Sequence, residues 1–275
     1  ATPFFLYLSH WDVHVPHRAR KTVVKKYAAK LEQIPAAKRR NFGPVYAAMI
    51  EAVDTSVGRV VDKLDELGLG EKTLVVFISD NGGLPGVSQL EPLRGSKGSL
   101  FEAGVRVPAC MRWSGTIEAG ATCETPITSV DFLPTFASLA GARLPAGQAP
   151  DGTDLTPLLH GKSLPERAIF WHYPLYLSGQ RGLSIDLPGG GHYIWRGFPS
   201  TALRRGDFKL IEFHEDDTVA LYNLAKDPGE QKNLADTQPE LAARLRAELD
   251  AWQAATKAPI PTEPNPECVL GSKGE

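Results

Sequence analysis

The chain has 275 residues, 42% of them hydrophobic, so it can bury one large core or a core with a smaller appended unit. Its 30 basic and 32 acidic residues give a formal net charge of -2, which offers no bulk attraction to nucleic acid or anionic lipid. No apolar run reaches about 18 residues, so no membrane span is expected. The cysteines, Cys110, Cys123 and Cys268, are too scattered for a disulfide framework or a zinc site, although one pair could bridge in an oxidising compartment.

The N-terminal residues predict a buried strand. Residues 4–9 (FFLYLS) form a continuous aromatic and apolar run that starts almost at Ala1. A chain that begins without Met or a leader, directly on a central strand, is expected to be a fragment or a processed chain. A loop rich in His and Pro follows, and then a basic amphipathic segment over residues 18–40.

A long helix and a second strand come next. Pro44 fits the first turn of a helix through YAAMIEAVDTSVGRVVDKLDELG, whose apolar residues recur at helical spacing until Gly68 and Gly70 end it. Residues 74–79 (LVVFIS) read as the next strand. The order strand, long helix, strand predicts a parallel α/β sheet with a crossover connection.

The rest of the chain divides into two regions with different patterns of predicted helices and strands. A Gly-rich loop over residues 80–99 precedes the strand-like VRVPACMRW and two short helices, DFLPTFASLAG and LTPLLHG. Beyond residue 164 come short strands at turn spacing (AIFWHY, HYIWRGF, TALRRGDFKLIEF, VALYNLA), a helix PELAARLRAELDAWQ and a Pro-rich extended tail. A hairpin turn is expected in RRGDF. We therefore expect an α/β body over residues 1–163 and a small antiparallel sheet with a packed helix over residues 164–275.

The end of the second predicted strand carries polar side chains. Asp80 and Asn81 follow it directly and precede two glycines. Ligand sites of open α/β sheets lie beyond the carboxyl ends of the strands. A carboxylate and an amide oxygen are hard ligands that suit Ca²⁺ or Mg²⁺. The structural alternative is an ordinary Asp-Asn-Gly-Gly turn, which is common after strands.

Two further motifs carry charged or titratable groups. Lys97 lies in PLRGSKGSLFEAGVRVP between small residues, so its ammonium could reach a tetrahedral oxyanion such as phosphate or sulfate, although a solvated surface lysine is the commoner case. The spacing is not that of a Walker loop. His10, His14 and His17 follow the first predicted strand, where a histidine can donate to an anion or protonate a leaving oxygen. At least one of them is expected to be structural.

The joint order of these motifs resembles the sulfatase family, the formylglycine-dependent type I sulfatases of the alkaline phosphatase superfamily. The Gly-Ser-Lys-Gly block through Val-Pro is its most specific part, and LYNLAKDPGEQKNLA and DGTDLTPLLHGK are also similar. Ser96 and Ala103 stand where glycine is commoner, and both are small. The resemblance implies part of an alkaline-phosphatase-like sheet flanked by helices, followed by the small antiparallel sheet and a C-terminal helix.

The resemblance also implies an activity and roles for single residues. The implied activity is hydrolysis of a sulfate ester, of a small molecule or a carbohydrate, with Ca²⁺ or alternatively Mg²⁺. Asp80 and Asn81 match metal ligands, Lys97 matches the lysine on the sulfate, and His14 in His-Val-Pro matches the histidine near the leaving oxygen. His172 in FWHYP is a candidate substrate contact, because the C-terminal subdomain of such proteins often helps to build the pocket. The residues alone do not fix a compartment, and the resemblance implies a periplasmic or secreted one.

The family's nucleophile has no counterpart in these residues. It is a formylglycine made from the cysteine of Cys-x-Pro/Ala-Ser-Arg, and no cysteine here has that context. We therefore expect the chain to be the C-terminal portion of a sulfatase, with the formylglycine upstream, inactive by itself and weak in calcium binding. The alternatives are a phosphomonoester or phosphonate hydrolase of the same superfamily, and a non-catalytic sulfatase-like binding module.

Overall fold

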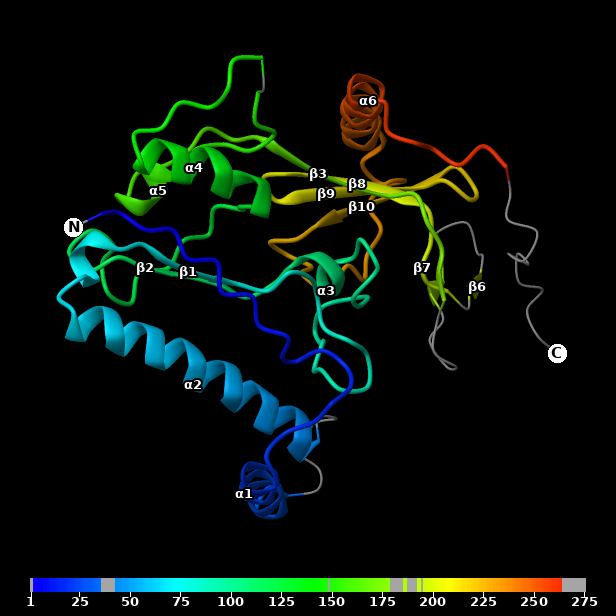
Figure 1. Ribbon diagram of the computed structural model, residues 1–275. Coiled ribbons are helices and arrows are strands. Elements are labelled where there is room, and N and C mark those ends of the chain that lie inside the picture. Colours follow the sequence, from blue (N-terminus) through cyan, green and yellow to red (C-terminus); the bar gives the residue numbers. More distant parts are fainter. Residues whose placement is uncertain are drawn as a thin grey trace. The chain divides into compact units, whose positions relative to one another are not determined.

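The computed structural model describes residues 2–35, 43–147, 149–178, 185–186, 192–193 and 195–263 (Figure 1). The chain forms two compact units by its internal contacts. Unit 1 is Ala1–Val75 with Gly83–Gln89, and unit 2 is Val76–Gly82 with Leu90–Glu275. The boundary expected between residues 163 and 164, between an α/β body and a C-terminal subdomain, stays a prediction.

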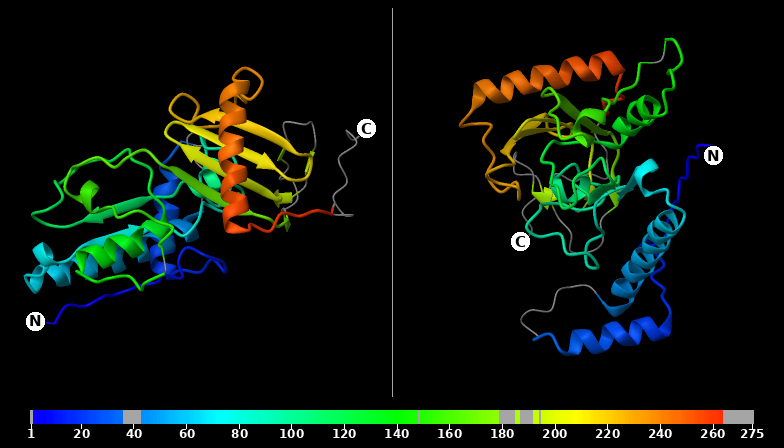
Figure 2. Two further views of the ribbon diagram at one scale, coloured as in Figure 1. Left: turned by 90° about the horizontal axis from the view of Figure 1, so that it is seen from above. Right: turned by 90° about the vertical axis from the view of Figure 1, so that its left-hand side faces the viewer.

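Unit 1 contains two helices that contact each other, α1 (Lys21–Glu32) and α2 (Pro44–Glu66), and the short 3-10 helix η2 (Gly70–Lys72) (Figure 2). An ion pair between Lys26 and Glu51 joins α1 to α2. As the sequence predicts, Pro44 lies in the first turn of α2. Gly68, just past its end, has a φ of +65°, which glycine adopts without strain.

The expectation of a buried strand over residues 4–9 is wrong. These residues form no strand with any part of the chain that the structure describes, and the side chains of Phe5 and Tyr7 are 75% and 81% exposed. An apolar run shows that side chains would gain from burial, but a strand also needs neighbours that supply hydrogen bonds and cover its faces. Periodicity along the chain cannot report whether such neighbours exist.

A strand pair follows, β1 (Val75–Ile78), which belongs to unit 2 except for its first residue, and β2 (Ala109–Arg112). The short helix α3 (Glu102–Val105) lies between the two strands in the chain. Both strands and the two following helices lie where the sequence predicts them. These helices are α4 (Phe132–Leu139), preceded by the 3-10 turn η3 (Ser129–Asp131), and α5 (Thr156–Leu159).

The C-terminal part of unit 2 is an antiparallel sheet in the order β10-β9-β8-β3. Its strands are β3 (Ala168–Tyr173), β8 (Ser200–Arg205), β9 (Phe208–Phe213) and β10 (Thr218–Asn223). Gly206, with a φ of +55°, lies in the hairpin between β8 and β9, which confirms the turn expected in RRGDF. Two minor pairs involve β4 (Leu177–Ser178) with β7 (Trp195–Gly197) and β5 (Ile185–Asp186) with β6 (His192–Tyr193).

Alternating side chains give this sheet two buried faces. One face packs against α6 (Pro239–Thr256), which lies over the sheet in Figure 1 and crosses its strands in the left view of Figure 2. Its contacts are made by Leu203, Leu210 and Leu221 from the strands and Leu245 and Leu249 from the helix. The opposite face packs against Leu100 and Phe101, which follow the Gly-Ser-Lys-Gly block. The expected α/β fold with an antiparallel sheet and a C-terminal helix is therefore confirmed. None of the helices in the described ranges is both long and apolar enough to cross a membrane.

Candidate functional site

The turn after β1 presents two oxygen ligands. The side chain of Asp80 is exposed, and its Oδ1 accepts a hydrogen bond from the backbone N–H of Asn81 at 2.9 Å. Asn81 donates through Nδ2 to the carbonyl oxygen of Gly82 at 3.1 Å, so its amide oxygen is oriented away from this bond. The hydroxyl of Ser79 donates to the carbonyl of Asn81 at 3.0 Å and fixes the turn further. Asp80 and Asn81 can therefore offer adjacent oxygens to a cation.

Lys97 lies in a compact glycine loop over residues 94–104. Gly95 and Gly98 flank it with φ angles of +80° and +93°, which an L side chain rarely adopts. The N–H of Ser99 donates to the carbonyl of Ser96 at 3.0 Å, and the N–H of Ala103 donates to the carbonyl of Arg94 at 2.8 Å, which closes the base of the loop. Lys97 is only partly buried, so a defined backbone carries a reachable ammonium group.

The two predicted motifs of unit 2 lie against each other. The backbone N–H of Gly82 donates to the carbonyl of Gly104 at 3.0 Å. A Cβ atom on Gly82 would lie 1.8 Å from the carbonyl oxygen of Ala103, so only glycine allows this approach. The structure thereby joins the Asp80–Asn81 turn directly to the loop that carries Lys97.

A buried ionic cluster contacts the C-terminal end of this loop. The sequence analysis did not identify it. The ammonium of Lys209, on β9, lies 3.0 Å from Oε1 of Glu102 and 2.9 Å from Oε1 of Glu230. Oε2 of Glu230 accepts the backbone N–H of Glu102 at 2.7 Å. The side chains of all three residues are at most 2% exposed. The available signal was a lysine in the strand-like stretch FKLIEF, which is apolar except for Lys209 and Glu212, because a buried ammonium needs carboxylate partners.

The histidines of the N-terminal loop lie in unit 1. His10 is hydrogen-bonded through Nε2 to the hydroxyl of Ser56 at 2.9 Å, and His17 packs edge-on against Tyr46, so both have structural partners. His14 is exposed, with Nδ1 3.1 Å from the carbonyl of Val15. Since a carbonyl only accepts, Nδ1 carries the proton in this contact, which leaves Nε2 to bind or release one. The approach of His14 to Asp80, Asn81 and Lys97 stays a prediction.

His172, on β3, is hydrogen-bonded at both ring nitrogens. Nδ1 lies 2.8 Å from the hydroxyl of Thr201, and Nε2 lies 3.1 Å from the carbonyl of Pro259. The same hydroxyl is 2.8 Å from Nε2 of His214, whose pKa is lowered by burial. These contacts give His172 a structural role, and its role as a substrate contact stays a prediction.

The oxygen donors of the turn fit part of a calcium shell. Ca²⁺ takes six to eight oxygen ligands, and Asp80 with Asn81 supplies donors of the right chemistry. Within the part of the chain that the structure describes, no group of three or more His, Cys, Asp or Glu side chains could hold a metal ion. The two residues can therefore contribute to a metal site and cannot complete one.

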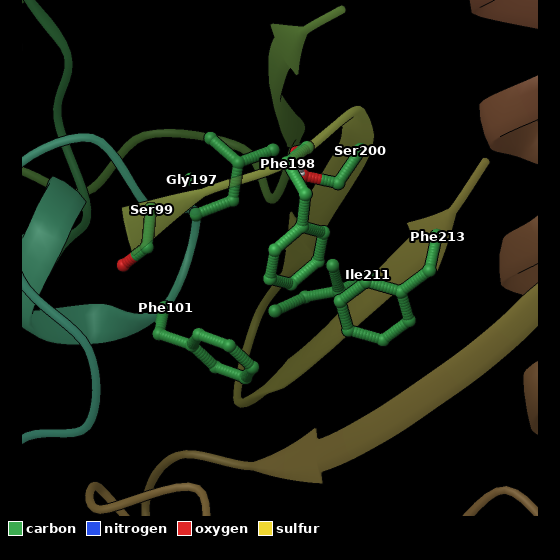
Figure 3. A pocket seen from close by; sticks show the side chains of 8 residues that line it. Ser99, Phe101, Gly197, Phe198, Ser200, Ile211 and Phe213 are labelled. Carbon is green, nitrogen blue, oxygen red and sulfur yellow. Dashed lines mark hydrogen bonds between the residues drawn. The ribbon is translucent and has the colours of Figure 1, made fainter. Parts of the chain in front are cut away.

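A small depression beneath the Lys97 loop is lined mainly by aromatic and aliphatic side chains, together with Ser99 and Ser200. Its lining includes Ser99, Leu100 and Phe101 from the loop and Phe198 and Phe213 from the sheet region. Figure 3 shows the rings of Phe101, Phe198 and Phe213 directed toward one another, with centroids of Phe198 and Phe213 5.4 Å apart. These aromatic contacts pack the loop against the sheet.

Comparison with known proteins agrees with these features. The family model described as Sulfatase matches residues 1–142. A sulfatase of Formosa agariphila is 34% identical over 94% of this chain and 47% of its own length, and human arylsulfatase A is 35% identical over 90% and 50%. The crystal structure of Ps i-CgsB in complex with k-i-k-neocarrahexaose aligns with a TM-score of 0.74 and 27% identity, over 96% of this chain and 52% of that one.

A second solved structure, a complex with D-glucosamine-2-N,6-O-disulfate as substrate, aligns with a TM-score of 0.59 and 25% identity over 82% of this chain and 42% of that one. The chain spans about half the length of the curated relatives it matches. The family model covers more than half of the chain, and the matches to sulfatases extend over nearly all of it. The chain belongs to the sulfatase family.

Proposed function

We propose that this chain forms part of a sulfuric ester hydrolase that cleaves a sulfate ester of a carbohydrate. The observation that carries the proposal is the backbone contact between Gly82 and Gly104, which places the Asp80–Asn81 turn beside the loop of Lys97. A carboxylate and an amide oxygen suit a hard cation, and an ammonium group in a glycine loop suits a tetrahedral oxyanion. The two solved relatives that bind carbohydrates motivate the substrate class.

Each predicted residue has a role in this proposal. Asp80 and Asn81 hold part of the coordination shell of a calcium ion, with magnesium as the alternative. Such an ion, when bound, stabilises negative charge on the sulfate oxygens. Lys97 binds the same sulfate through its ammonium and holds it in place. His14, as an imidazolium, donates its Nε2 proton to the alcohol oxygen that leaves and remains as neutral imidazole with its proton on Nδ1. His172 contacts the alcohol portion of the substrate.

No residue described here is proposed as the nucleophile. The cysteines lack the Cys-x-Pro/Ala-Ser-Arg context from which the family makes its formylglycine. The activity therefore belongs to the complete protein that contains these residues, and a location outside the cytoplasm is part of the same proposal. The absence of that context is also what a non-catalytic sulfatase-like binding module would show, and this second candidate is tested alongside the first.

The test uses the complete coding sequence that contains this chain, assayed with 4-methylumbelliferyl sulfate, 4-methylumbelliferyl phosphate and sulfated oligosaccharides. We expect hydrolysis of sulfate esters, and a loss of about 10²–10³-fold in kcat/KM for Lys97→Ala, by analogy with loss of other groups that stabilise developing charge. Lys226→Ala, at an exposed lysine of the β10–α6 connection, is the matched control. Preference for the phosphate ester would assign the protein to phosphoryl chemistry. Oligosaccharide binding without turnover would assign it to the binding modules.

A further inference from the structure

We propose that Lys209, Glu102 and Glu230 act as positioning residues for Lys97, because their buried ionic cluster fixes the loop over residues 94–104 on the C-terminal sheet. The inference rests on the proposed function, in which Lys97 binds the sulfate group. None of the three side chains contacts Lys97 in the described structure. They act through the backbone of the loop, so the proposal adds no catalytic residue.

The cluster connects two parts of unit 2 that are distant along the chain. Glu102 is at the first position of α3, five residues after Lys97, and receives a hydrogen bond from Lys209, 107 positions later. The N–H of Glu102 donates to Glu230, 128 positions later. Both the backbone and the side chain of Glu102 are therefore tied to the sheet and to the loop that follows β10.

A second set of contacts ties the start of the Lys97 loop to β10 and to Glu230. One terminal nitrogen of Arg94 donates to the hydroxyl of Tyr222 and to the backbone carbonyl of Glu230, each at 3.1 Å. The guanidinium of Arg94 lies 4.3 Å from the centroid of the Phe101 ring. Burial raises the pKa of Tyr222 to about 12, so its hydroxyl stays neutral and can accept from Arg94. Both ends of the loop are thus anchored on β9, β10 and residue 230.

The backbone of Glu230 adopts a conformation that costs free energy. Its φ of +52° lies in the left-handed region, where glycine would be favoured over a residue with a Cβ. The preceding Gly229 approaches the carbonyl oxygen of Pro92 so closely that a Cβ would lie 2.7 Å from it. Glu230 therefore combines a strained backbone with a crowded glycine before it, at the point where its carboxylate contacts Lys209 and the N–H of Glu102.

Lys209 is the residue on which the ionic cluster depends most, because its ammonium is shared by both carboxylates. Removing the ammonium would leave the carboxylates of Glu102 and Glu230 buried together without their shared counter-ion, which is a strongly unfavourable arrangement. Burial already raises the pKa of Glu230. Glu230→Gln keeps the size of the side chain and an acceptor for the N–H of Glu102, so it is the milder change and guards against a variant that fails to fold.

The first experiment needs no catalysis. Amide hydrogen exchange of the 275-residue chain is followed for Lys209→Met, for Glu230→Gln and for Lys226→Met, an exposed lysine just before Glu230. We expect exchange over residues 94–105 to rise by about tenfold or more in Lys209→Met, less in Glu230→Gln and not in Lys226→Met, while α6 keeps its protection. Equal acceleration in the loop and in α6, or none in the loop for either cluster variant, would overturn the proposal.

The second experiment asks whether the cluster acts through Lys97. In the complete protein, Lys209→Met is expected to lower kcat/KM for a sulfate ester by about 100-fold, the effect of a small misplacement of a binding group. In a Lys97→Ala background the same change should have little further effect, because residues that act through one another are not additive. Full additivity would show a general structural role and contradict the proposal. If no sulfate ester is hydrolysed, the proposed function fails, and the exchange experiment still decides the position of the loop.

Discussion

The backbone N–H of Gly82 donates to the carbonyl of Gly104 at 3.0 Å, and this bond joins the turn after β1 to the loop that carries Lys97. The approach is close because neither residue has a side chain. A Cβ on Gly82 would lie 1.8 Å from the carbonyl oxygen of Ala103, and one on Gly104 would lie 2.0 Å from that of Ser99. The geometry of the candidate site therefore depends on two glycines that carry no chemistry of their own.

Gly82→Ala tests this dependence directly. The new methyl group would overlap backbone atoms, which cannot rotate away, so we expect a loss of about 3 kcal/mol in the free energy of unfolding. Gly58→Ala is the matched control, since it lies within α2 with open space around its Cβ position and should stabilise the chain by about 0.5–1 kcal/mol. Chemical denaturation measures both. Equal stability of Gly82→Ala and the unsubstituted chain would show that the two segments can separate without cost.

The buried pair of Asp131 and Arg167 provides a second prediction. Asp131 is fully buried before α4, and both of its oxygens contact the guanidinium of Arg167. The carboxylate also accepts backbone N–H groups of Thr128 and Thr153 at 2.8 Å. Asp131→Ala would leave the Arg167 charge and two donors without this acceptor, so we expect a loss of about 3–5 kcal/mol.

The matched control for this change is Asp151→Ala at an exposed aspartate close by in the chain, for which a change within about 0.5 kcal/mol is expected. Equilibrium unfolding followed by circular dichroism compares the two variants. A small loss for Asp131→Ala, similar to that of Asp151→Ala, would mean that water or another side chain replaces the carboxylate at low cost.

The outcome at these sites shows what a sequence can and cannot predict. Pro44, Gly68 and Gly206 are local signals for a helix start, a helix end and a hairpin, and each lies where the sequence predicts it. The roles predicted for Asp80 and Lys97 rest on the glycines near them in the sequence, and they stay predictions. Residues 4–9 were predicted to be buried and are exposed, because burial depends on partners from elsewhere in the chain.

The ionic cluster also depends on partners that are distant in the chain, which the sequence does not reveal. Glu102 and Lys209 are separated by 107 positions, and no periodicity or motif links them. Lys209 in its mostly apolar stretch indicates a buried charge, but nothing in the sequence indicates which carboxylates it pairs with, since lysine and glutamate are rarely fully buried. Only the fold, which pairs β9 with β10 and lays the loop of Glu102 over them, reveals that these charges compensate each other.

The burial of His214 predicts that the folded chain loses stability in mild acid. Burial lowers its pKa in the folded chain, with a smaller opposing contribution from Glu212, whose Oε2 lies 3.8 Å from Nδ1. His172, Asp217 and Arg246 also act on it. Below the ordinary histidine pKa of about 6.5 the unfolded chain binds a proton that the folded chain does not, so stability falls as the pH drops through this range.

The measurement compares the unfolding free energies of the unsubstituted chain and His214→Gln between pH 7.5 and 5. For one proton, the unfolding free energy changes with pH by at most about 1.4 kcal/mol per pH unit. His214→Gln should remove this contribution to the slope. His160→Gln, at an exposed histidine, should keep the slope of the unsubstituted chain. A slope that His214→Gln leaves unchanged would assign the acid sensitivity to other groups.

The 275-residue chain should bind calcium only weakly, because Asp80 and Asn81 provide oxygens for a fraction of the six to eight that calcium takes. Water must fill the other positions, so we expect a dissociation constant of about 10⁻³ M or weaker in isothermal titration, similar for magnesium. Asp80→Ala should weaken even this binding, whereas Asp151→Ala, at an exposed aspartate elsewhere, should not. Micromolar binding that depends on Asp80 would contradict the prediction, since it would require several more oxygen ligands from these residues than the turn after β1 supplies.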